Sequence, residues 1–568
     1  MNILGINLNH MSSACLVKDG KLISSSTEER FTRNKLTRDF PYNSIKFCLN
    51  KSNLEISDID AVSIAWNPAI NLEVYKKSFS QTHRWFPELL YIIPNNLFNI
   101  GKIEANYYTS QQFYSEKSKK KIEIFYINHH LCHLAQAFLN SGFSSSGLLS
   151  IDGFGERTST AFGVANKKDI KILETIDFPH SLGSFYETVT EFLGYKADAD
   201  EWKVMGMAAY GDKSRFKKKF DRLINKTENN SYELNLNYFN HYNFDSPNRF
   251  TDKFKKLFHL IEPIKNNIIK KEHFDFAAAA QDKFEDVYEH LLRFFTSKTK
   301  LKNICLGGGS IMNCLANGRL SYKFPTKNFY TTFAPDDSGL SIGSALFLSH
   351  YIFNKKTDYK SVETSSGIEF NNDEIKKSLK KYKINFKYHK DIENIVSKYI
   401  LENKTVGWFQ GKAEFGQRAL GNRSILANPA TKNIKDIVNA TVKYRESYRP
   451  FAPSCLKEDA EKFFKFNKNI NPYYMQYAVE ATSMAKKLIP SVVHEDNTSR
   501  IQIVLREKNK RYHELLKQLK EKSGVGIVLN TSFNLKGEPI VNTPEDAIRT
   551  FFSSGLDILC LGNFIIEK

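Results

Sequence analysis

The sequence predicts an α/β protein with two domains, the first of which contains a duplicated sheet. The chain has 568 residues, which is too long for one hydrophobic core. Short apolar strands that end in a polar residue before a turn occur within residues 2–27 and again from residue 148 onward. A polar, irregular stretch at 358–374 is predicted to link a first domain, residues 1–357, to a separate α/β domain, residues 375–568.

The first copy of the layout consists of three predicted strands, NILGINL, SACLVK and KLISSST. Asp19-Gly20 lies between the last two and predicts a hairpin turn. The first strand ends at Asn7 and His10, so their polar groups are expected at the edge of the sheet. The charged loop Glu28–Lys35 is interpreted either as solvated or as an anion-binding loop near that edge.

A helix is predicted to begin after Asn128, with His129 and His133 four residues apart. Residues at i and i+4 lie on one face of a helix, so the two imidazoles can bind one divalent metal. Asp152 ends the next apolar run and can return to the same point as a third ligand. Paired histidines also occur for purely structural reasons. The position after His129 is not a Glu, which excludes the HExxH protease arrangement.

The segments TSTAFGVAN and IKILETIDF follow as further strands and complete the second copy of the layout. Helices are predicted at Gly183–Tyr195 and at Asp275–Phe295, the second with Asp275 as its N-terminal cap. Residues 212–270 are polar and poor in motifs, and we interpret them as an insertion. Two copies of one sheet layout suggest that a ligand is held between them.

Two turns of the first domain carry further candidate groups. A run of three glycines between a strand and a helix exposes N–H groups that favour phosphate, although such a run also suits any tight turn. The candidates for nucleotide binding here are Gly307, Gly308, Gly309 and Asn313. Asp336 and Asp337 open a later helix; they are expected either to cap it or to supply, from one of the two, a fourth metal ligand.

Three loops of the second domain carry cations and amides that suit a triphosphate. Arg offers a bidentate fork to phosphate and Lys a point charge. In a chain this basic, any one of these cations taken alone is expected at the surface. The side chains concerned are Lys412, Glu414, Arg418 and Arg423 in the first loop, Lys443, Arg445 and Arg449 in the second, and Asn530, Ser532 and Asn534 in the third.

The composition restricts the partners and the compartment. A formal net charge of +19 favours anionic partners, with 41% hydrophobic residues typical of a globular protein. The seven cysteines are scattered without a CxxC pair, which fits a reducing compartment. The N-terminus lacks the features of a signal peptide, and no apolar run is long enough to span a bilayer. We therefore expect a soluble, cytoplasmic protein without a membrane partner.

Nine segments, taken together and in this order, carry a resemblance to a known family. They occur between residues 28 and 534 and read EERFTR, HHLCHLAQAF, IDGFGE, KVMGMAAYG, LGGGSIMN, DSGLSIGSA, GQRALGNRSIL, KYRESYRPFAP and NTSFN. With these segments the chain resembles the NodU/CmcH carbamoyltransferase family. The resemblance implies a duplicated actin/sugar-kinase-like (ASKHA) domain followed by a YrdC-like α/β domain. It also implies that carbamoyl phosphate and ATP form carbamoyl-adenylate in the second domain, and that the first domain transfers the carbamoyl group to a hydroxyl.

The resemblance assigns roles to individual positions. The implied metal ligands are His129, His133, Asp152 and Asp337, typically for Fe2+, with Mg2+ accompanying ATP. His10 matches a histidine near the acceptor and has the chemistry of a base; Lys443 and Arg449 are the other implied catalytic residues. The implied nucleotide and carbamoyl contacts in the second domain are Lys412, Arg418, Arg423, Arg445, Asn530 and Ser532. Met11 and Leu36 depart from the Asp and His usual at their positions, which leaves the acceptor contacts open.

Two other functions remain open at this point. One is carbamoylation of tRNA or another nucleic acid, which the fused second domain argues against. The other is a nucleotide-switched binding module without group transfer. A plain sugar kinase is disfavoured because Asn7 stands where a phosphate-binding Asp is expected. The acceptor, whether a small molecule of natural product biosynthesis or a sugar, cannot be read from the sequence, and neither can the oligomeric state.

Overall fold

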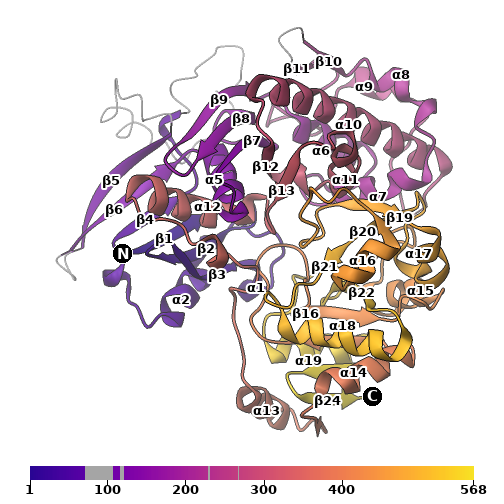
Figure 1. The fold of residues 1–568 in the computed structure, drawn as a ribbon. Coiled ribbons are helices and arrows are strands. Elements are labelled where there is room, and N and C mark those ends of the chain that lie inside the picture. The colour runs from indigo at the N-terminus through magenta and orange to yellow at the C-terminus, as the bar shows by residue number, and fades with distance from the viewer. Residues whose placement is uncertain (71–106, 116–119, 228–230, 267) are drawn as a thin grey trace. The chain divides into compact units, whose positions relative to one another are not determined.

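The computed structural model describes residues 1–70, 107–115, 120–227, 231–266 and 268–568 (Figure 1). By its internal contacts the chain divides into two compact units. The first unit comprises Met1–Ile23, Arg38–Ala316 and Phe324–Val362, and the second comprises Ser24–Thr37, Asn317–Lys323 and Glu363–Lys568. The division after Val362 lies within the stretch predicted as a linker. The second unit also includes two segments from much earlier in the chain.

The first sheet begins with the three strands predicted at the N-terminus. Asp19 and Gly20 both have positive φ, 48° and 79°, which is the hairpin geometry that their sequence predicts. β1 pairs antiparallel with β2 and parallel with β4, and β4 pairs parallel with β6. Among the described residues the spatial order is β3 (Lys21–Thr27), β2 (Ser13–Lys18), β1 (Asn2–Asn7), β4 (Ala61–Ile64), β6 (Lys120–Ile127) and β5 (Tyr108–Ser115).

The second sheet repeats this arrangement. Its strand β7 pairs antiparallel with β8 and parallel with β12, which in turn pairs parallel with β13. The described strands lie in the order β13 (Asn328–Thr331), β12 (Asn303–Gly307), β7 (Ser145–Ile151), β8 (Thr158–Asn166) and β9 (Ile170–Asp177). The mixed α/β class and the repeated layout are therefore as predicted, whereas the assignment to the actin/sugar-kinase class stays a prediction.

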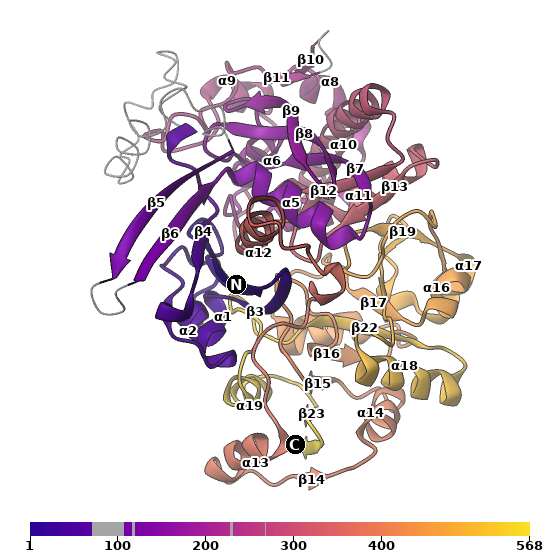
Figure 2. The same cartoon turned by 60° about the vertical axis from the view of Figure 1, so that its left-hand side comes forward.

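Two helices of the first unit position the candidate metal ligands. α5 (His129–Ser141) begins at Asn128, whose side chain accepts a hydrogen bond from the Leu131 N–H. α12 (Leu340–Phe347) packs along α5, as Figure 2 shows. The unit also contains α2 (Tyr42–Lys51), α6 (Leu182–Phe192), α7 (Glu201–Met207), α8 (Lys217–Phe220), α9 (Asp252–Leu257) and α10 (Lys271–Thr299). No helix of the described residues is long and apolar enough to cross a membrane.

Aromatic side chains of the stretch 212–270 pack against α6 and α10. Phe220, Phe254 and Phe258 are fully buried, and their rings contact Phe192 of α6 or Phe276 of α10. β10 (Ile224–Lys226) and β11 (Tyr232–Leu234) form a small hairpin in this region. The described residues of this stretch are thus a packed part of the first unit.

The prediction that Asp275 caps the long helix is wrong. α10 begins one turn earlier, after Lys270, where the side chain of His273 accepts a hydrogen bond from the Lys270 N–H. Asp275 lies inside the helix and instead accepts a hydrogen bond from the Asp212 N–H and pairs with Arg215.

The second unit is built on a larger mixed sheet. In the part of the chain that the structure describes, its spatial order is β14 (Lys387–Tyr388), β24 (Phe564–Glu567), β23 (Ile558–Leu561), β15 (Val406–Phe409), β16 (Arg423–Ala427), β22 (Ile527–Ser532), β17 (Ala452–Cys455) and β21 (Gln502–Ile503). Three short strands pair beside it, namely β18 (Phe464–Lys465), β19 (Ala478–Ala481) and β20 (Thr498–Arg500). The assignment to the YrdC-like fold stays a prediction.

Helices cover this sheet around a core that contains the buried Trp408. α14 (Ile392–Leu401) packs against α18 (Lys510–Ser523) over that core. The remaining helices are α13 (Asn372–Lys381), α15 (Ile434–Val438), α16 (Lys457–Phe463), α17 (Ser483–Leu488) and α19 (Pro544–Phe552). α11 (Cys314–Lys323) begins in the first unit, and its residues from Asn317 onward belong to the second.

Candidate metal centre and anion site

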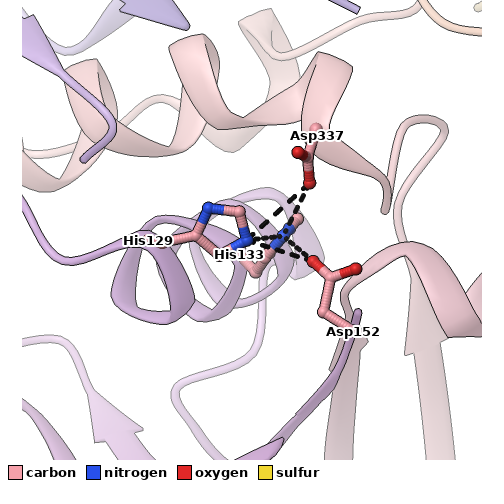
Figure 3. A group of neighbouring side chains, drawn as sticks. All are labelled: His129, His133, Asp152 and Asp337. Carbon is pink, nitrogen blue, oxygen red and sulfur yellow. Dashed lines mark hydrogen bonds and ion pairs between the residues drawn. The ribbon is translucent and has the colours of Figure 1, made fainter. Parts of the chain in front are cut away.

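Four side chains of the first unit converge on one point (Figure 3). The ligand atoms of His129, His133, Asp152 and Asp337 all lie within 4.8 Å of one another. Asp152 Oδ2 is 3.1 Å from Nε2 of His129 and 2.8 Å from Nε2 of His133. Asp337 Oδ1 is 3.7 Å and 3.6 Å from the same two nitrogens. The helix α5 brings the imidazoles together, β7 delivers Asp152 at its end, and the turn before α12 delivers Asp337.

The electrostatics of this group favour a cation at its centre. The two Nε2 atoms are only 3.2 Å apart, and two neutral imidazoles bearing Nε2–H would direct their hydrogens at each other. Burial alone lowers the pKa of His133, but the hydrogen bonds and charges of Asp152 and Asp337 outweigh it and raise the pKa to about 9. Two imidazole nitrogens and two carboxylate oxygens are a suitable ligand set for a divalent transition metal, so the residues present fit one.

The glycine run predicted to bind phosphate lies against this group. Gly309 N–H donates to Asp152 Oδ1 at 3.2 Å, and a Cβ at Gly309 would lie 2.9 Å from that oxygen. Gly308 has φ 91°, a conformation that glycine adopts without strain. The backbone of the run therefore orients a candidate metal ligand. Asn313 caps α11 through the Ala316 N–H and exchanges hydrogen bonds with Gln281.

The neighbours of the four ligands have other partners. His130 contacts Ser150 Oγ at 2.9 Å and the Thr158 carbonyl at 2.8 Å, and burial lowers its pKa to about 3. Glu156 accepts hydrogen bonds from the His129 and Asn67 N–H groups, which anchors the start of α5. Both residues support the position of the ligands without joining them.

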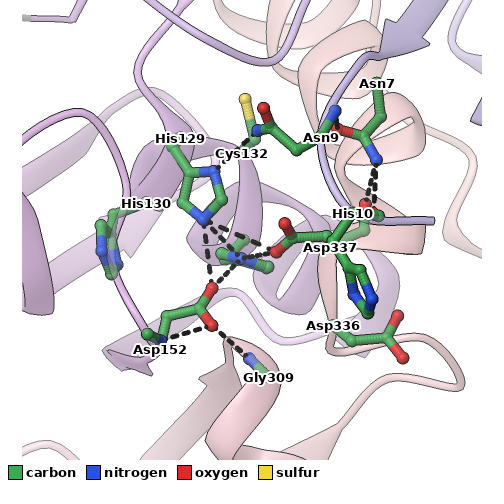
Figure 4. Close-up of polar contacts among 12 residues, drawn as sticks. Asn7, Asn9, His10, His129, His130, Cys132, Asp152, Gly309, Asp336 and Asp337 are labelled. Carbon is green, nitrogen blue, oxygen red and sulfur yellow. Dashed lines mark hydrogen bonds and ion pairs between the residues drawn. The ribbon is translucent and has the colours of Figure 1, made fainter. Parts of the chain in front are cut away.

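His10 lies beyond the metal ligands in the same unit (Figure 4). Its carbonyl accepts a hydrogen bond from Asn7 Nδ2, which also donates to the Asp337 carbonyl at 2.9 Å. Its Nδ1 is 4.0 Å from Asp198 Oδ1, and Arg38 binds the other oxygen of Asp198 at 2.5 Å. Asp198 has φ 62°, a left-handed conformation that few residues with a side chain adopt and that Asp adopts more often than most.

A second polar centre lies within the second unit and is built around Lys443. This residue ends η10 (Asn439–Lys443), a π-helical turn, and its ammonium is buried. Its Nζ donates to Asn534 Oδ1 at 2.7 Å and to Ser532 Oγ at 3.2 Å. Burial, followed by the positive charges of Arg445, Arg449 and Lys35, holds the pKa of Lys443 well below its usual range.

Arg445 belongs to the same centre. Its Nε donates to Asn439 Oδ1 at 2.6 Å, and its guanidinium lies 4.4 Å from the centre of the Phe451 ring. Burial, then the charges of Arg449 and Arg500, hold the pKa of Arg445 well below its usual range. Neutral oxygen atoms accept the hydrogen bonds of Lys443 and Arg445, so the positive charge of the group is suited to an added anion.

Other predicted residues of the second unit have different surroundings. Arg423 is fully buried, donates to the carbonyls of Gln410 and Gly411, and lies 3.6 Å from the centre of the Phe409 ring. Asn530 is also buried, and it donates to Ala419 O, Ser454 Oγ and Gln502 Oε1. The side chain of Lys412 is exposed and that of Arg418 is half-buried. Arg423 and Asn530 thus hold the loops in place.

Three residues described above are not among the site residues that the sequence predicts. Asn534 was noted as an amide but not counted among the ligand-binding residues, although it contacts Lys443 directly. The sequence places Lys35 in the charged loop after the third predicted strand, whereas the structure groups it with the second unit. Asp198 gave no signal, since its left-handed conformation is visible only in the structure.

Comparisons with known proteins match both halves of the chain. The family described as Carbamoyltransferase N-terminus matches residues 2–346, and Carbamoyltransferase C-terminus matches residues 397–568. The nodulation protein NolNO of Sinorhizobium fredii is 33% identical over 98% of this chain and 79% of its own length. A 3'-hydroxymethylcephem-O-carbamoyltransferase of Streptomyces clavuligerus is 29% identical over 43% of this chain and 44% of its own length.

Among solved structures, full-length HypF in its phosphate- and nucleotide-bound form aligns with a TM-score of 0.31 at 14% identity. The alignment covers 61% of this chain and 55% of that one, a likeness too weak to assign the fold. The family matches define the protein as a carbamoyltransferase, a transferase enzyme. The chain belongs to the NodU/CmcH family.

Proposed function

We propose that this protein is an ATP-dependent O-carbamoyltransferase that works in two steps. In the second unit, carbamate derived from carbamoyl phosphate reacts with ATP to give carbamoyl-adenylate. In the first unit, the carbamoyl group passes to a hydroxyl of a small-molecule or sugar acceptor. The observation that carries the proposal is the buried cationic group around Lys443 and Arg445, whose hydrogen bonds go to neutral oxygens.

The first step needs positive charge at fixed positions. Water hydrolyses carbamoyl phosphate to phosphate and carbamate; a carbamate oxygen then attacks the α-phosphorus of ATP, and pyrophosphate leaves. Negative charge develops on the phosphate oxygens, and preorganised cations in a dry site stabilise it far more than water does. Lys443, held by Ser532 and Asn534, and Arg445, held by Asn439, supply such cations without reorganisation. Arg449, whose Nη1 lies 3.7 Å from Glu446 Oε2, is a third cation close by.

The second step needs a base for the acceptor hydroxyl. The hydroxyl oxygen attacks the carbamoyl carbon, the bond to AMP breaks, and the hydroxyl proton must be removed. When His10 keeps its proton on Nδ1, the atom nearest Asp198, its Nε2 is free to take the acceptor proton. His129, His133, Asp152 and Asp337 would hold a divalent metal, which would supply Lewis-acid polarisation of a carbonyl or phosphate oxygen.

The direct test is mass-spectrometric detection of carbamoyl-AMP from purified protein, MgATP and carbamoyl phosphate, with pyrophosphate release as the kinetic readout. Lys443→Met is expected to lower the rate of adenylate formation at least about a hundredfold, because a preorganised cation is lost from the reacting phosphates. Lys432→Met is the matched control, since Lys432 is an exposed lysine of the same region. Wild-type protein that forms no carbamoyl-AMP under these conditions would contradict the proposal.

A further inference from the structure

Part of the second unit comes from the start of the chain. Residues Ser24–Thr37 pack with Glu363–Lys568. The short helix α1 (Glu29–Thr32) lies in this segment, and its Arg30 is buried and donates to the carbonyls of Glu414 and Gly416. The sequence predicts this segment to be a solvated or anion-binding loop near the first sheet, whereas the structure packs it into the second unit, which contains the site around Lys443.

Arg33 makes the most specific contacts of this segment. Its Nη1 donates to the Ile540 carbonyl at 2.7 Å, and its Nη2 donates to the Pro539 carbonyl at 2.8 Å. Its Nε lies 3.6 Å from Asp546 Oδ1, near the start of α19. A planar guanidinium that binds two consecutive carbonyls fixes their orientation as well as their position. Arg33 therefore clamps the loop that follows β22.

The clamped loop leads directly to Lys443. Asn534 Nδ2 donates to the Glu538 carbonyl at 2.7 Å, one residue before Pro539. The other atom of the same amide, Asn534 Oδ1, accepts the hydrogen bond from Lys443 Nζ. The chain of contacts thus runs from Arg33 through the loop to Asn534 and then to the buried ammonium.

We propose that segment Ser24–Thr37 contributes to the function of the anion site in the second unit. Arg33 is a positioning residue that acts through Asn534 on Lys443. The inference deepens the proposed function and rests on it in assigning the anion to ATP.

A double-mutant cycle in the full-length protein tests the role of Arg33. Arg33→Gln is expected to lower the turnover number for pyrophosphate release by about tenfold or more, while the KM for carbamoyl phosphate changes less. Asn534→Ala should have a comparable effect. If Arg33 acts through Asn534, the double variant is no slower than Asn534→Ala alone. If the rate losses of the two single variants multiply in the double variant, or if Arg33→Gln keeps wild-type turnover, the assignment is overturned. A purely structural role of Arg33 predicts a lower melting temperature with unchanged turnover of the folded protein.

Calorimetric MgATP titration gives a second readout, which does not depend on the chemical step. Arg33→Gln is expected to weaken MgATP binding by about tenfold, because the ammonium of Lys443 is no longer held in place. Asn34→Ala, an exposed neighbour, is the matched control and should bind MgATP like the wild type. Wild-type MgATP affinity in Arg33→Gln would overturn the inference even if wild-type protein forms no carbamoyl-AMP, a result that would by itself overturn only the proposed function.

Discussion

Asp336 and Asp337 are adjacent in the sequence, yet their carboxylates have different partners. Asp336 turns back on its own chain, where it accepts hydrogen bonds from the backbone N–H and the hydroxyl of Ser338. Asp337 instead directs Oδ1 at the Nε2 atoms of His129 and His133 (Figure 3). The geometry therefore favours Asp337 as the metal ligand and Asp336 as the cap of the turn.

This difference predicts that two isosteric substitutions affect metal content unequally. Asp337→Asn is expected to lower the metal bound per chain at least about tenfold, because a neutral amide replaces an anionic ligand. Asp336→Asn retains an oxygen that can accept the Ser338 N–H and should keep its metal. Inductively coupled plasma mass spectrometry of protein reconstituted with Fe2+ measures both. Equal metal content in the two variants would contradict the assignment.

Asp198 is predicted to affect the transfer step alone. Asp198→Asn removes the carboxylate near His10 Nδ1 and should slow transfer to the acceptor by about tenfold to a hundredfold, since the protonated imidazole loses its counter-charge. Carbamoyl-AMP formation should be unchanged. The matched control is Asp200→Asn, which removes a nearby carboxylate that pairs with Lys203. Single-turnover transfer from preformed carbamoyl-AMP measures the effect, and an equal loss in both steps would exclude this role.

Glu414 is predicted to hold the glycine-rich loop of the second unit. Its Oε1 accepts hydrogen bonds from the N–H groups of Leu420, Asn422 and Arg423. Its negative charge also stabilises the positive charges of the buried Arg30 and Arg423. Glu414→Gln keeps an acceptor but leaves the guanidiniums without that charge, so it should destabilise the second unit by about 3 kcal/mol.

Guanidinium unfolding monitored by tryptophan fluorescence measures this loss, because Trp408 donates to the carbonyl of Gly421 in the same loop. Glu402→Gln, at an exposed position, is the control and should unfold like the wild type. A midpoint shift of the same size in both variants would show that the buried charge is not the cause.

Glu201 is predicted to make stability depend on pH. Burial, with the charge of Asp198, raises its pKa to about 7, above the ordinary value of 4.5. The folded state therefore holds a proton that the unfolded state releases, so this contribution to stability is present below about pH 4.5 and is lost as pH rises through about 7. Glu201→Gln removes the titration and keeps the acceptor for the Asp198 N–H. Its melting temperature relative to wild type should rise between about pH 5 and pH 8, and a constant difference across this range would refute the prediction.

The sequence was sufficient for features that depend on neighbouring residues. The turn at Asp19-Gly20, the start of α5 at Asn128 and the approach of His129 to His133 all follow from local rules. The convergence of Asp152 on the two histidines was also predictable, because a strand end and a helix start meet at one edge of a sheet.

The remaining features depend on contacts between residues far apart in the chain. The cap of α10 was mispredicted because the helix begins one turn before Asp275, where the side chain of His273 accepts a hydrogen bond from the Lys270 N–H. The clamp formed by Arg33 joins residues 507 positions apart, and no local pattern indicates it. Arg423 looked like a phosphate ligand because burial among carbonyls is not visible in a loop sequence.

The membership of Ser24–Thr37 in the second unit has a consequence for inheritance and engineering. A gene fragment that encodes only residues from Glu363 onward lacks Arg30 and the clamp on the loop after β22. The C-terminal half is therefore not a unit that can be exchanged on its own. Recombination at the linker would exchange it successfully only when the new partner brings a compatible N-terminal segment, so the two halves are expected to be inherited together.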